Sequence, residues 1–314
     1  MPLLAPASII MGILLSSHMI SYSFLVPWIF AFITFSGSLG SNLRSLHLSI
    51  KQPLPIFMIL FLLHIVMPLW AGAVGHIAFS GDVFTISGLI LSMVIPTGIT
   101  SLLWVSIHKG NIALTFSTVL IDTVLSPFIL PLMLSLLVGK SIEMEVWNMM
   151  YSLIGMVVVP SLLAMVLNQM THGQVERTLS PMLAPFSKIG LAIVIMINGA
   201  VVAPYLTNIN LKLVLIAIVV FCVAATGYII SWIAGRFIKC NEEDVIALTF
   251  TGGIRNISAG SVIALTYFPP PVAVPVVIGM LFQQVLASSF GYLLKRFYTN
   301  DINIGNITTV KKEG

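Results

Sequence analysis

Long apolar runs fill almost the whole chain, and short polar or Gly/Pro-rich breaks separate them. An apolar run of about 18 or more residues is long enough to cross the hydrocarbon layer of a membrane as a helix. The pattern therefore predicts an all-α polytopic membrane protein, with residues 1–314 forming a single membrane domain. The breaks predict ten transmembrane helices, over residues 3–21, 24–43, 53–77, 83–107, 111–138, 146–170, 182–206, 211–236, 243–267 and 271–294.

The composition agrees with this pattern and excludes several classes of protein. Only 8% of the 314 residues are charged and 58% are hydrophobic, whereas about 25% of the residues in soluble domains are charged. The chain has no His-Glu-x-x-His zinc motif, and Gly-Lys-Ser at 139–141 lacks the upstream glycine of a phosphate-binding loop. We therefore expect neither an enzyme nor an ATP-driven pump, with no cofactor, no metal site and no nucleic-acid partner.

The basic residues indicate how the chain is oriented in the membrane. Ten spans place both termini on one side, and eleven basic residues fall on that side against two on the other. Because loops rich in Lys and Arg stay in the cytoplasm, we expect a multi-pass protein of the cell membrane with both termini cytoplasmic. The eleven are Arg44, Lys51, Lys109, Arg177, Lys188, Arg236, Lys239, Lys295, Arg296, Lys311 and Lys312, and the two are Lys140 and Lys212.

The fourth and ninth expected spans each contain helix-breaking residues. Pro96 and Gly98 interrupt the fourth, and Gly252 and Gly253 interrupt the ninth. Proline lacks a backbone N–H, and glycine adopts backbone angles that other residues resist. Backbone groups freed at membrane depth are tolerated only where they line a cavity or are buried in protein. Ordinary kinks are the alternative interpretation, since Gly and Pro are common in membrane helices.

These two breaks occupy matching places in two sets of five spans. An odd repeat length inserts the second copy into the membrane upside down, and inverted repeats with paired broken helices are an architecture of secondary transporters. We therefore predict two inverted repeats, residues 1–140 and 141–314, whose broken helices cross near the midplane of the membrane and form a polar site there.

Three ionisable side chains lie deep within expected spans: Arg255, Asp122 and His64. A charged group at the bilayer centre costs at least about 2.5–3.5 kcal/mol, so these groups should face the protein interior, and Asp122 is the natural partner of Arg255. Two roles are open for such a pair. Asp122 takes and releases a proton as Arg255 engages a substrate carboxylate, or a permanent ion pair holds two spans together. His64 either carries a proton or makes a helix–helix hydrogen bond.

Around both breaks the sequence resembles the bile acid:sodium symporter family. The motifs that carry the resemblance are residues 96–111 with their Lys-Gly-Asn turn, residues 253–256, Pro-Pro-Val-Ala-Val-Pro at 270–275, and Ile-Val-Met-Pro-Leu at 65–69. The resemblance covers almost the whole chain. It implies ten helices with inverted repeats crossing at the fourth and ninth spans. It also implies uptake of organic anions together with sodium by alternating access.

The chain departs from the family pattern at positions that the resemblance assigns to sodium binding. Thr251 replaces the usual glutamate, and Arg255 replaces a glutamine. Ser101 is retained and Thr115 preserves a hydroxyl. The other departures are Leu102 for an asparagine, Val119 for a hydroxyl and Leu63 for a glutamine. Since sodium needs several hard oxygen ligands and a permanent guanidinium repels a cation, the family's sodium sites are expected to be absent or weakened.

These observations predict a secondary transporter of a small or amphipathic organic anion, working by alternating access with lost or altered sodium coupling. Two alternatives stay open: a conventional sodium symporter with rearranged ligands, and a transport-inactive membrane sensor. A proton is the expected replacement if an ion is coupled. The residues expected to bind substrate are Arg255, Asn256, Thr251, Ser101, Thr100 and Thr115, and those expected to take part in coupling are Asp122 and His64.

Overall fold

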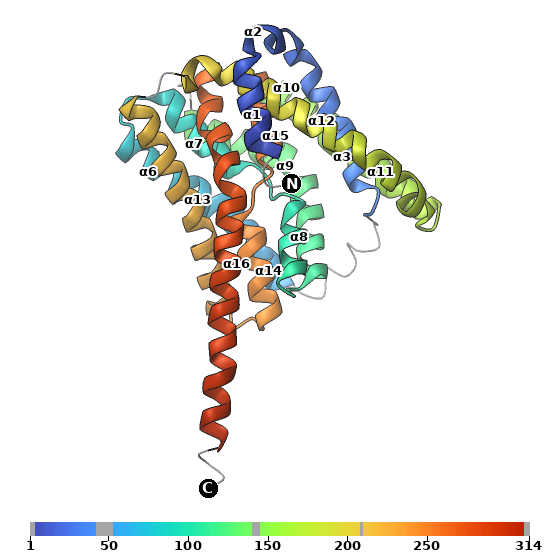
Figure 1. Ribbon diagram of the computed structural model, residues 1–314, viewed down its shortest axis with the longest axis vertical. Coiled ribbons are helices and arrows are strands. Elements are labelled where there is room, and N and C mark those ends of the chain that lie inside the picture. The colour runs from blue at the N-terminus through green and yellow to red at the C-terminus, as the bar shows by residue number, and fades with distance from the viewer. Residues whose placement is uncertain (1–3, 42–52, 140–144, 208–209, 311–314) are drawn as a thin grey trace.

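The computed structural model describes residues 4–41, 53–139, 145–207 and 210–310, and within these ranges it is all-helical (Figure 1). The α-helices are α1 (Leu4–Leu14), α2 (Ser16–Met19), α3 (Val26–Ser38), α5 (Pro53–Phe61), α6 (Met67–Ala78), α7 (Val83–Val94), α8 (Thr100–Ile107), α9 (Ile112–Val138), α10 (Val146–Leu153), α11 (Val159–Met170), α12 (Gln174–Leu206), α13 (Leu211–Phe237), α14 (Glu242–Gly253), α15 (Ile257–Tyr267) and α16 (Ala273–Val310). Two 3₁₀-helices, η1 (Ile20–Leu25) and η5 (Pro270–Val272), and two π-helices, η2 (Leu62–Val66) and η4 (Ile154–Val158), connect some of them.

Seven helical stretches in the described residues are long and apolar enough to cross a membrane, so the chain is a multi-pass membrane protein. They are Ser16–Ser38, Pro53–Ala78, Ile112–Val138, Val146–Met170, Gln174–Leu206, Leu211–Phe237 and Pro270–Tyr298. The count of ten spans and the division into two repeats stay predictions. The expected boundary at residue 140 lies outside the described residues, as do Arg44, Lys51, Lys140, Lys311 and Lys312 of the orientation argument.

The first expected span, residues 3–21, is wrong as a single helix. α1 ends at Leu14, and α2 and η1 then lead the chain into α3. The polar run Ser16–His18 follows the end of α1 and opens a short helix of its own. The end of the first expected span and most of the second therefore form one helical stretch, Ser16–Ser38.

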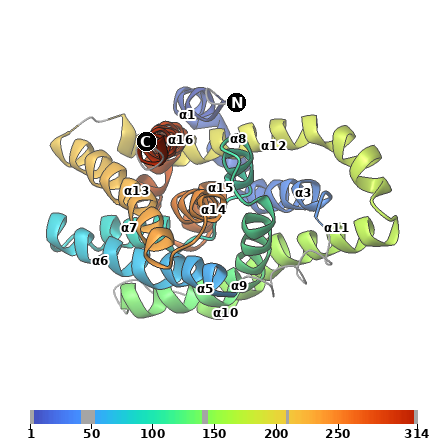
Figure 2. The ribbon, with the colours of Figure 1, turned by 90° about the horizontal axis from the view of Figure 1, so that it is seen from below.

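The fourth and ninth expected spans are each split into two short helices. α7 and α8 are separated by residues 95–99, and α14 and α15 by residues 254–256. Seen from below in Figure 2, α14 and α15 lie in the middle of the molecule, with α8, α9, α13 and α16 around them. The interrupted backbone is therefore enclosed by protein, which is where broken helices at membrane depth are tolerated.

Two of the continuous spans contain a π-turn just before a proline. η2 precedes Met67-Pro68, and the Met67 N–H bonds the Leu62 carbonyl, five residues back. η4 precedes Val159-Pro160 in the same way. A proline inside a helix has no N–H and crowds the carbonyl four residues earlier, which for Pro68 is the carbonyl of His64. The wider π-turn relieves this contact, and such turns are frequent at functional sites.

The remaining spans form a second group of packed helices. α3, α11 and α12 run side by side, away from α6 and α13 (Figure 1). α1 packs against α12 through glycines: a side chain at Gly12 would overlap the backbone of Met196, and one at Gly199 would lie 2.9 Å from the carbonyl oxygen of Ile9. Small residues of this kind let membrane helices approach closely, so α1 is held by backbone contact.

Candidate functional site

The breaks of the two interrupted spans lie against each other and form the candidate site, here called the crossover (residues 95–99 and 254–256). Thr97 and Arg255 form an isolated antiparallel β-bridge. The Asn256 N–H donates to the Pro96 carbonyl oxygen at 2.8 Å. Gly98 lies beside this bridge, and a Cβ there would lie 3.1 Å from the Arg255 carbonyl oxygen. Residues from two distant parts of the chain thus satisfy each other's freed backbone groups.

Four helix ends meet at the crossover. α7 and α14 end there, and α8 and α15 begin there. The Asn256 side chain caps α15 by accepting from the Ala259 N–H at 3.3 Å, and no side chain caps the start of α8. A helix carries partial negative charge at its C-terminus and partial positive charge at its N-terminus. The ends of α7 and α14 therefore favour cations, and the starts of α8 and α15 favour anions.

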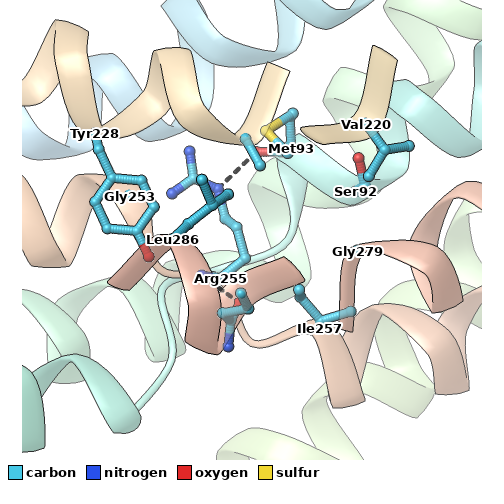
Figure 3. A pocket seen from close by; sticks show the side chains of 11 residues that line it. Ser92, Met93, Val220, Tyr228, Gly253, Arg255, Ile257, Gly279 and Leu286 are labelled. Atoms are coloured by element: carbon cyan, nitrogen blue, oxygen red, sulfur yellow. Dashed lines mark hydrogen bonds between the residues drawn. The ribbon is translucent and has the colours of Figure 1, made fainter. Parts of the chain in front are cut away.

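Several carbonyl groups at the two C-terminal ends accept hydrogen bonds from donors of the protein itself. The Arg255 guanidinium donates through Nη1 to the Gly252 carbonyl oxygen at 2.7 Å and through Nε to the Met93 carbonyl oxygen at 3.3 Å. Figure 3 shows the Arg255 side chain reaching between Tyr228 and Met93. One fixed cation therefore joins the last turns of α7 and α14, where helix dipoles favour positive charge.

Thr97 donates to two further carbonyl oxygens at the α14 end. Its hydroxyl donates to the Thr251 carbonyl oxygen at 2.8 Å and to the Ile254 carbonyl oxygen at 3.1 Å. Sequence analysis gave Thr97 no role, although it lies within the Pro-Thr-Gly break; the only signal for it was this position. Thr97 and the Arg255 guanidinium together donate hydrogen bonds to carbonyl oxygens that could otherwise ligate a cation.

Arg255 is only 3% exposed, and it lines a small cavity between α7, α13 and α16. The cavity has a volume of about 20 Å³, which is room for one or two water molecules, so an organic anion does not fit it in this conformation. Within the described ranges, Nη2 of Arg255 and the hydroxyl of Tyr228 have no hydrogen-bond partner. Tyr228 also explains Gly253, because a side chain at Gly253 would overlap the Tyr228 ring.

The structure does not contain the direct ion pair expected between Arg255 and Asp122. Among the described residues Asp122 pairs instead with His64, whose Nε2 lies 2.6 Å from Asp122 Oδ1. The second carboxylate oxygen accepts from the Thr97 N–H at 2.6 Å. The sequence identified Arg255, Asp122 and His64 as ionisable groups at depth, but it could not show which faces meet. His64 lies in the π-turn η2, where the helix is locally widened. The sequence pattern did not predict this turn.

The other predicted site residues are divided between the interior and the outside of the crossover. Thr251 and Thr115 are fully buried and their hydroxyls lie 3.4 Å apart. Ser101 is also fully buried, and its hydroxyl has no hydrogen-bond partner among the residues described. Asn256 is partly exposed and Thr100 is exposed, both near helix N-termini. Thr251, Thr115 and Ser101 thus lie inside the protein, whereas Asn256 and Thr100 reach its surface.

Three apolar residues occupy positions at which the family resemblance implies a sodium ligand. Leu63 and Val119 are buried, and Leu102 is partly exposed. In the described part of the chain, His, Cys, Asp and Glu side chains form no group of three that could hold a metal ion.

An apolar helical bundle with two broken helices that meet inside it is the architecture of a secondary membrane transporter. Comparison with known sequences gives the same class. The profile of the SBF-like CPA transporter family matches residues 24–299, and the chain belongs to that family. This agrees with the resemblance to bile acid:sodium symporters, because relatives of that type are found as well.

Three relatives illustrate the range of similarity. The uncharacterized protein YbaS of Bacillus subtilis (strain 168) is 54% identical over 95% of this chain and 97% of its own length. The uncharacterized sodium-dependent transporter YocS of the same organism is 25% identical over 64% of this chain and 61% of its own. The probable sodium/metabolite cotransporter BASS1 of Oryza sativa subsp. japonica, a chloroplastic protein, is 26% identical over 68% of this chain and 52% of its own.

Proposed function

We propose that this protein carries a small or amphipathic organic anion across the cell membrane by alternating access, without a bound sodium ion. The observation that carries the proposal is the bridging of the two interrupted helices by Arg255, through the Gly252 and Met93 carbonyl oxygens. A guanidinium does not lose its proton in proteins. It therefore supplies permanently, from within the chain, the positive charge that a bound cation would bring.

Sodium binding at this place is disfavoured on two grounds. The carbonyl oxygens of Thr251, Gly252 and Ile254 accept hydrogen bonds from Thr97 and Arg255. A sodium ion would have to displace these donors. It would also have to sit beside the guanidinium, and like charges in a medium of low dielectric repel strongly.

An anionic substrate agrees with the charges that the crossover presents. The N-termini of α8 and α15 open towards it, and Thr100 and Asn256 lie at these helix starts with exposed or partly exposed side chains. Broken helices of transporters use such N-termini to hold anionic groups. Arg255 adds the electrostatic attraction of a full positive charge from behind the same break. In this arrangement it attracts the anion through the electric field, since the small cavity at its guanidinium does not admit an organic molecule.

Movement of one helix group against the other is the mechanism that we propose for alternating access. The group with α3, α11 and α12 would serve as the fixed support. The group with the crossover would move against it and carry the site from one side to the other. In this scheme residues 1–140 and 141–314 are the two inverted repeats, and both termini face the cytoplasm.

A conventional sodium symporter is the second candidate, because two relatives are named as sodium-coupled, YocS and BASS1. Counterflow into proteoliposomes separates these candidates. Vesicles preloaded with one unlabelled acid of a panel (pyruvate, gluconate, taurocholate) are diluted into the labelled form. The medium contains either sodium or choline.

We expect counterflow of at least one acid at the same rate in both media. A strict requirement for sodium, with saturation, would overturn the built-in cation and select the second candidate. Binding of a labelled acid without any flux would identify the transport-inactive sensor.

A further inference from the structure

A second buried polar centre lies next to the crossover and is separate from the contacts of Arg255. It consists of His64 and Asp122, joined by the 2.6 Å contact between Nε2 and Oδ1. His64 is 4% exposed and Asp122 is fully buried. The π-turn before Pro68 holds His64 on this side of its span. We assign the hydrogen of this contact to His64 Nε2, donated to the Asp122 carboxylate.

The capacity of this pair to accept a proton depends on the other ring nitrogen of His64, Nδ1. Nδ1 is buried, and no residue that the structure describes forms a hydrogen bond with it. When Nε2 carries the hydrogen donated to Asp122, neutral histidine leaves a lone pair on Nδ1. Histidine is the side chain whose unperturbed charge change falls between pH 5 and 8. The pair therefore has one proton-accepting position, Nδ1, that no described residue occupies, beside the Asp122 carboxylate.

The charges around this centre can be counted from the elements packed against η2, which are α5, α6, α7 and α9. α5 and α7 carry no titratable residue, α6 carries only the exposed His76, and α9 carries only Asp122. Beyond Asp122 lies Arg255. With neutral His64, the charges of Arg255 and Asp122 cancel. With protonated His64, the centre and the crossover together carry one net positive charge, which one monovalent anion neutralises.

Thr97 connects the two centres. Its N–H donates to Asp122 Oδ2, its backbone forms the bridge to Arg255, and its hydroxyl holds the end of α14. A change of charge at His64 and Asp122 therefore acts on the same peptide that positions the crossover, so proton binding and anion binding are linked through one residue.

We propose that His64 takes up one proton on Nδ1 for each anionic charge that the protein carries, which makes transport a proton–anion symport. The inference rests on the proposed function and names its driving ion. The proton enters from the side where substrate binds, forms an N–H bond at Nδ1, and leaves that atom on the opposite side when the anion is released. No other bond is made or broken, and each cycle moves no net charge.

Proteoliposomes with an imposed pH gradient test this inference, using the acid of the panel that shows counterflow. For one proton per monovalent anion, each unit of pH gradient, about 1.36 kcal/mol, should raise the accumulation ratio about tenfold. Accumulation should be unaffected by a potassium diffusion potential. We expect His64→Gln to retain counterflow, which also shows that it is folded, but to lose accumulation driven by the pH gradient.

The matched control is His76→Gln, because His76 lies on the same span with an exposed side chain; its accumulation should equal that of the wild type. Accumulation that survives unchanged in His64→Gln would overturn the inference. So would wild-type counterflow that a pH gradient cannot drive uphill, and this result would leave the proposed anion carrier standing. Absence of wild-type counterflow for every acid would overturn both proposals together.

Discussion

At the scale of single residues, Arg255 resolves a conflict between membrane insertion and an interrupted helix. Each buried carbonyl left without a donor costs about 1–3 kcal/mol, and a charged side chain at depth costs at least about 2.5–3.5 kcal/mol. Placing the guanidinium on the Gly252 and Met93 carbonyl oxygens reduces both penalties at once. Nη2 has no hydrogen-bond partner in the part of the chain that the structure describes, so the side chain keeps one N–H group available as a donor.

Two substitutions of Arg255 separate its charge from its fork-shaped hydrogen bonding. Arg255→Gln removes the charge, and we expect apparent anion affinity in the counterflow assay to fall about tenfold, a loss of about 1.4 kcal/mol. Arg255→Lys keeps the charge but cannot bond both helix ends in the same way. It should therefore lose thermal stability in detergent while its anion affinity stays within a few-fold of the wild type. Unchanged affinity in Arg255→Gln would remove Arg255 from the electrostatics of binding.

The sequence predicted that three ionisable residues are buried at depth, but it did not predict how they pair. Arg255, Asp122 and His64 could be identified because ionisable groups are rare at membrane depth. Their pairing could not, because the direction of a side chain depends on local helix geometry. The π-turn at Leu62–Val66 rotates His64 relative to a regular helix, and nothing in the spacing of apolar residues reports such a turn. Thr97 was missed because an uncharged hydroxyl is common in membrane helices.

At the scale of helices, the sequence predicted the two helix breaks but did not predict the shape of the first span. Pro96 and the pair Gly252–Gly253 act on their own backbone, so a sequence pattern detects them. α1 is different, because it ends at Leu14 and leans on α12 through Gly12 and Gly199. Its position is set by a contact between residues almost two hundred positions apart, which hydropathy along the chain does not contain.

The glycine contact between α1 and α12 gives a prediction at the helix scale. Gly12→Leu places a side chain against the Met196 backbone, which cannot move without shifting α12. Overpacking of this kind costs typically about 1–3 kcal/mol, so we expect a lower midpoint of thermal unfolding in detergent. Gly155→Leu is the control, since Gly155 is exposed and a Cβ there would have no atom within 4 Å. Equal midpoints for the two variants would show that α1 is not held by this contact.

At the scale of the whole molecule, the orientation in the membrane is the property on which the direction of transport depends. Positive charge in the loops predicts that the turn between α13 and α14 is cytoplasmic, and this turn contains Lys239 and Cys240. Lys212 lies at the other end of α13 and pairs with Asp82 at 2.8 Å, on the opposite side of the bundle. The basic residues at the two ends of α13 are thus expected on opposite sides of the membrane.

Cys240 provides the measurement. An impermeant maleimide should label it in inside-out vesicles and leave it unlabelled in sealed right-side-out vesicles. Partial burial and the nearby charge of Asp244 raise the pKa of the Cys240 thiol. Since the thiolate is the reactive form, labelling should be slow at neutral pH and should accelerate as the pH rises. Cys222→Ser should label like the wild type and Cys240→Ser should not label. Labelling of Cys240 only in right-side-out vesicles would reverse the orientation, and with it the side from which substrate and proton enter.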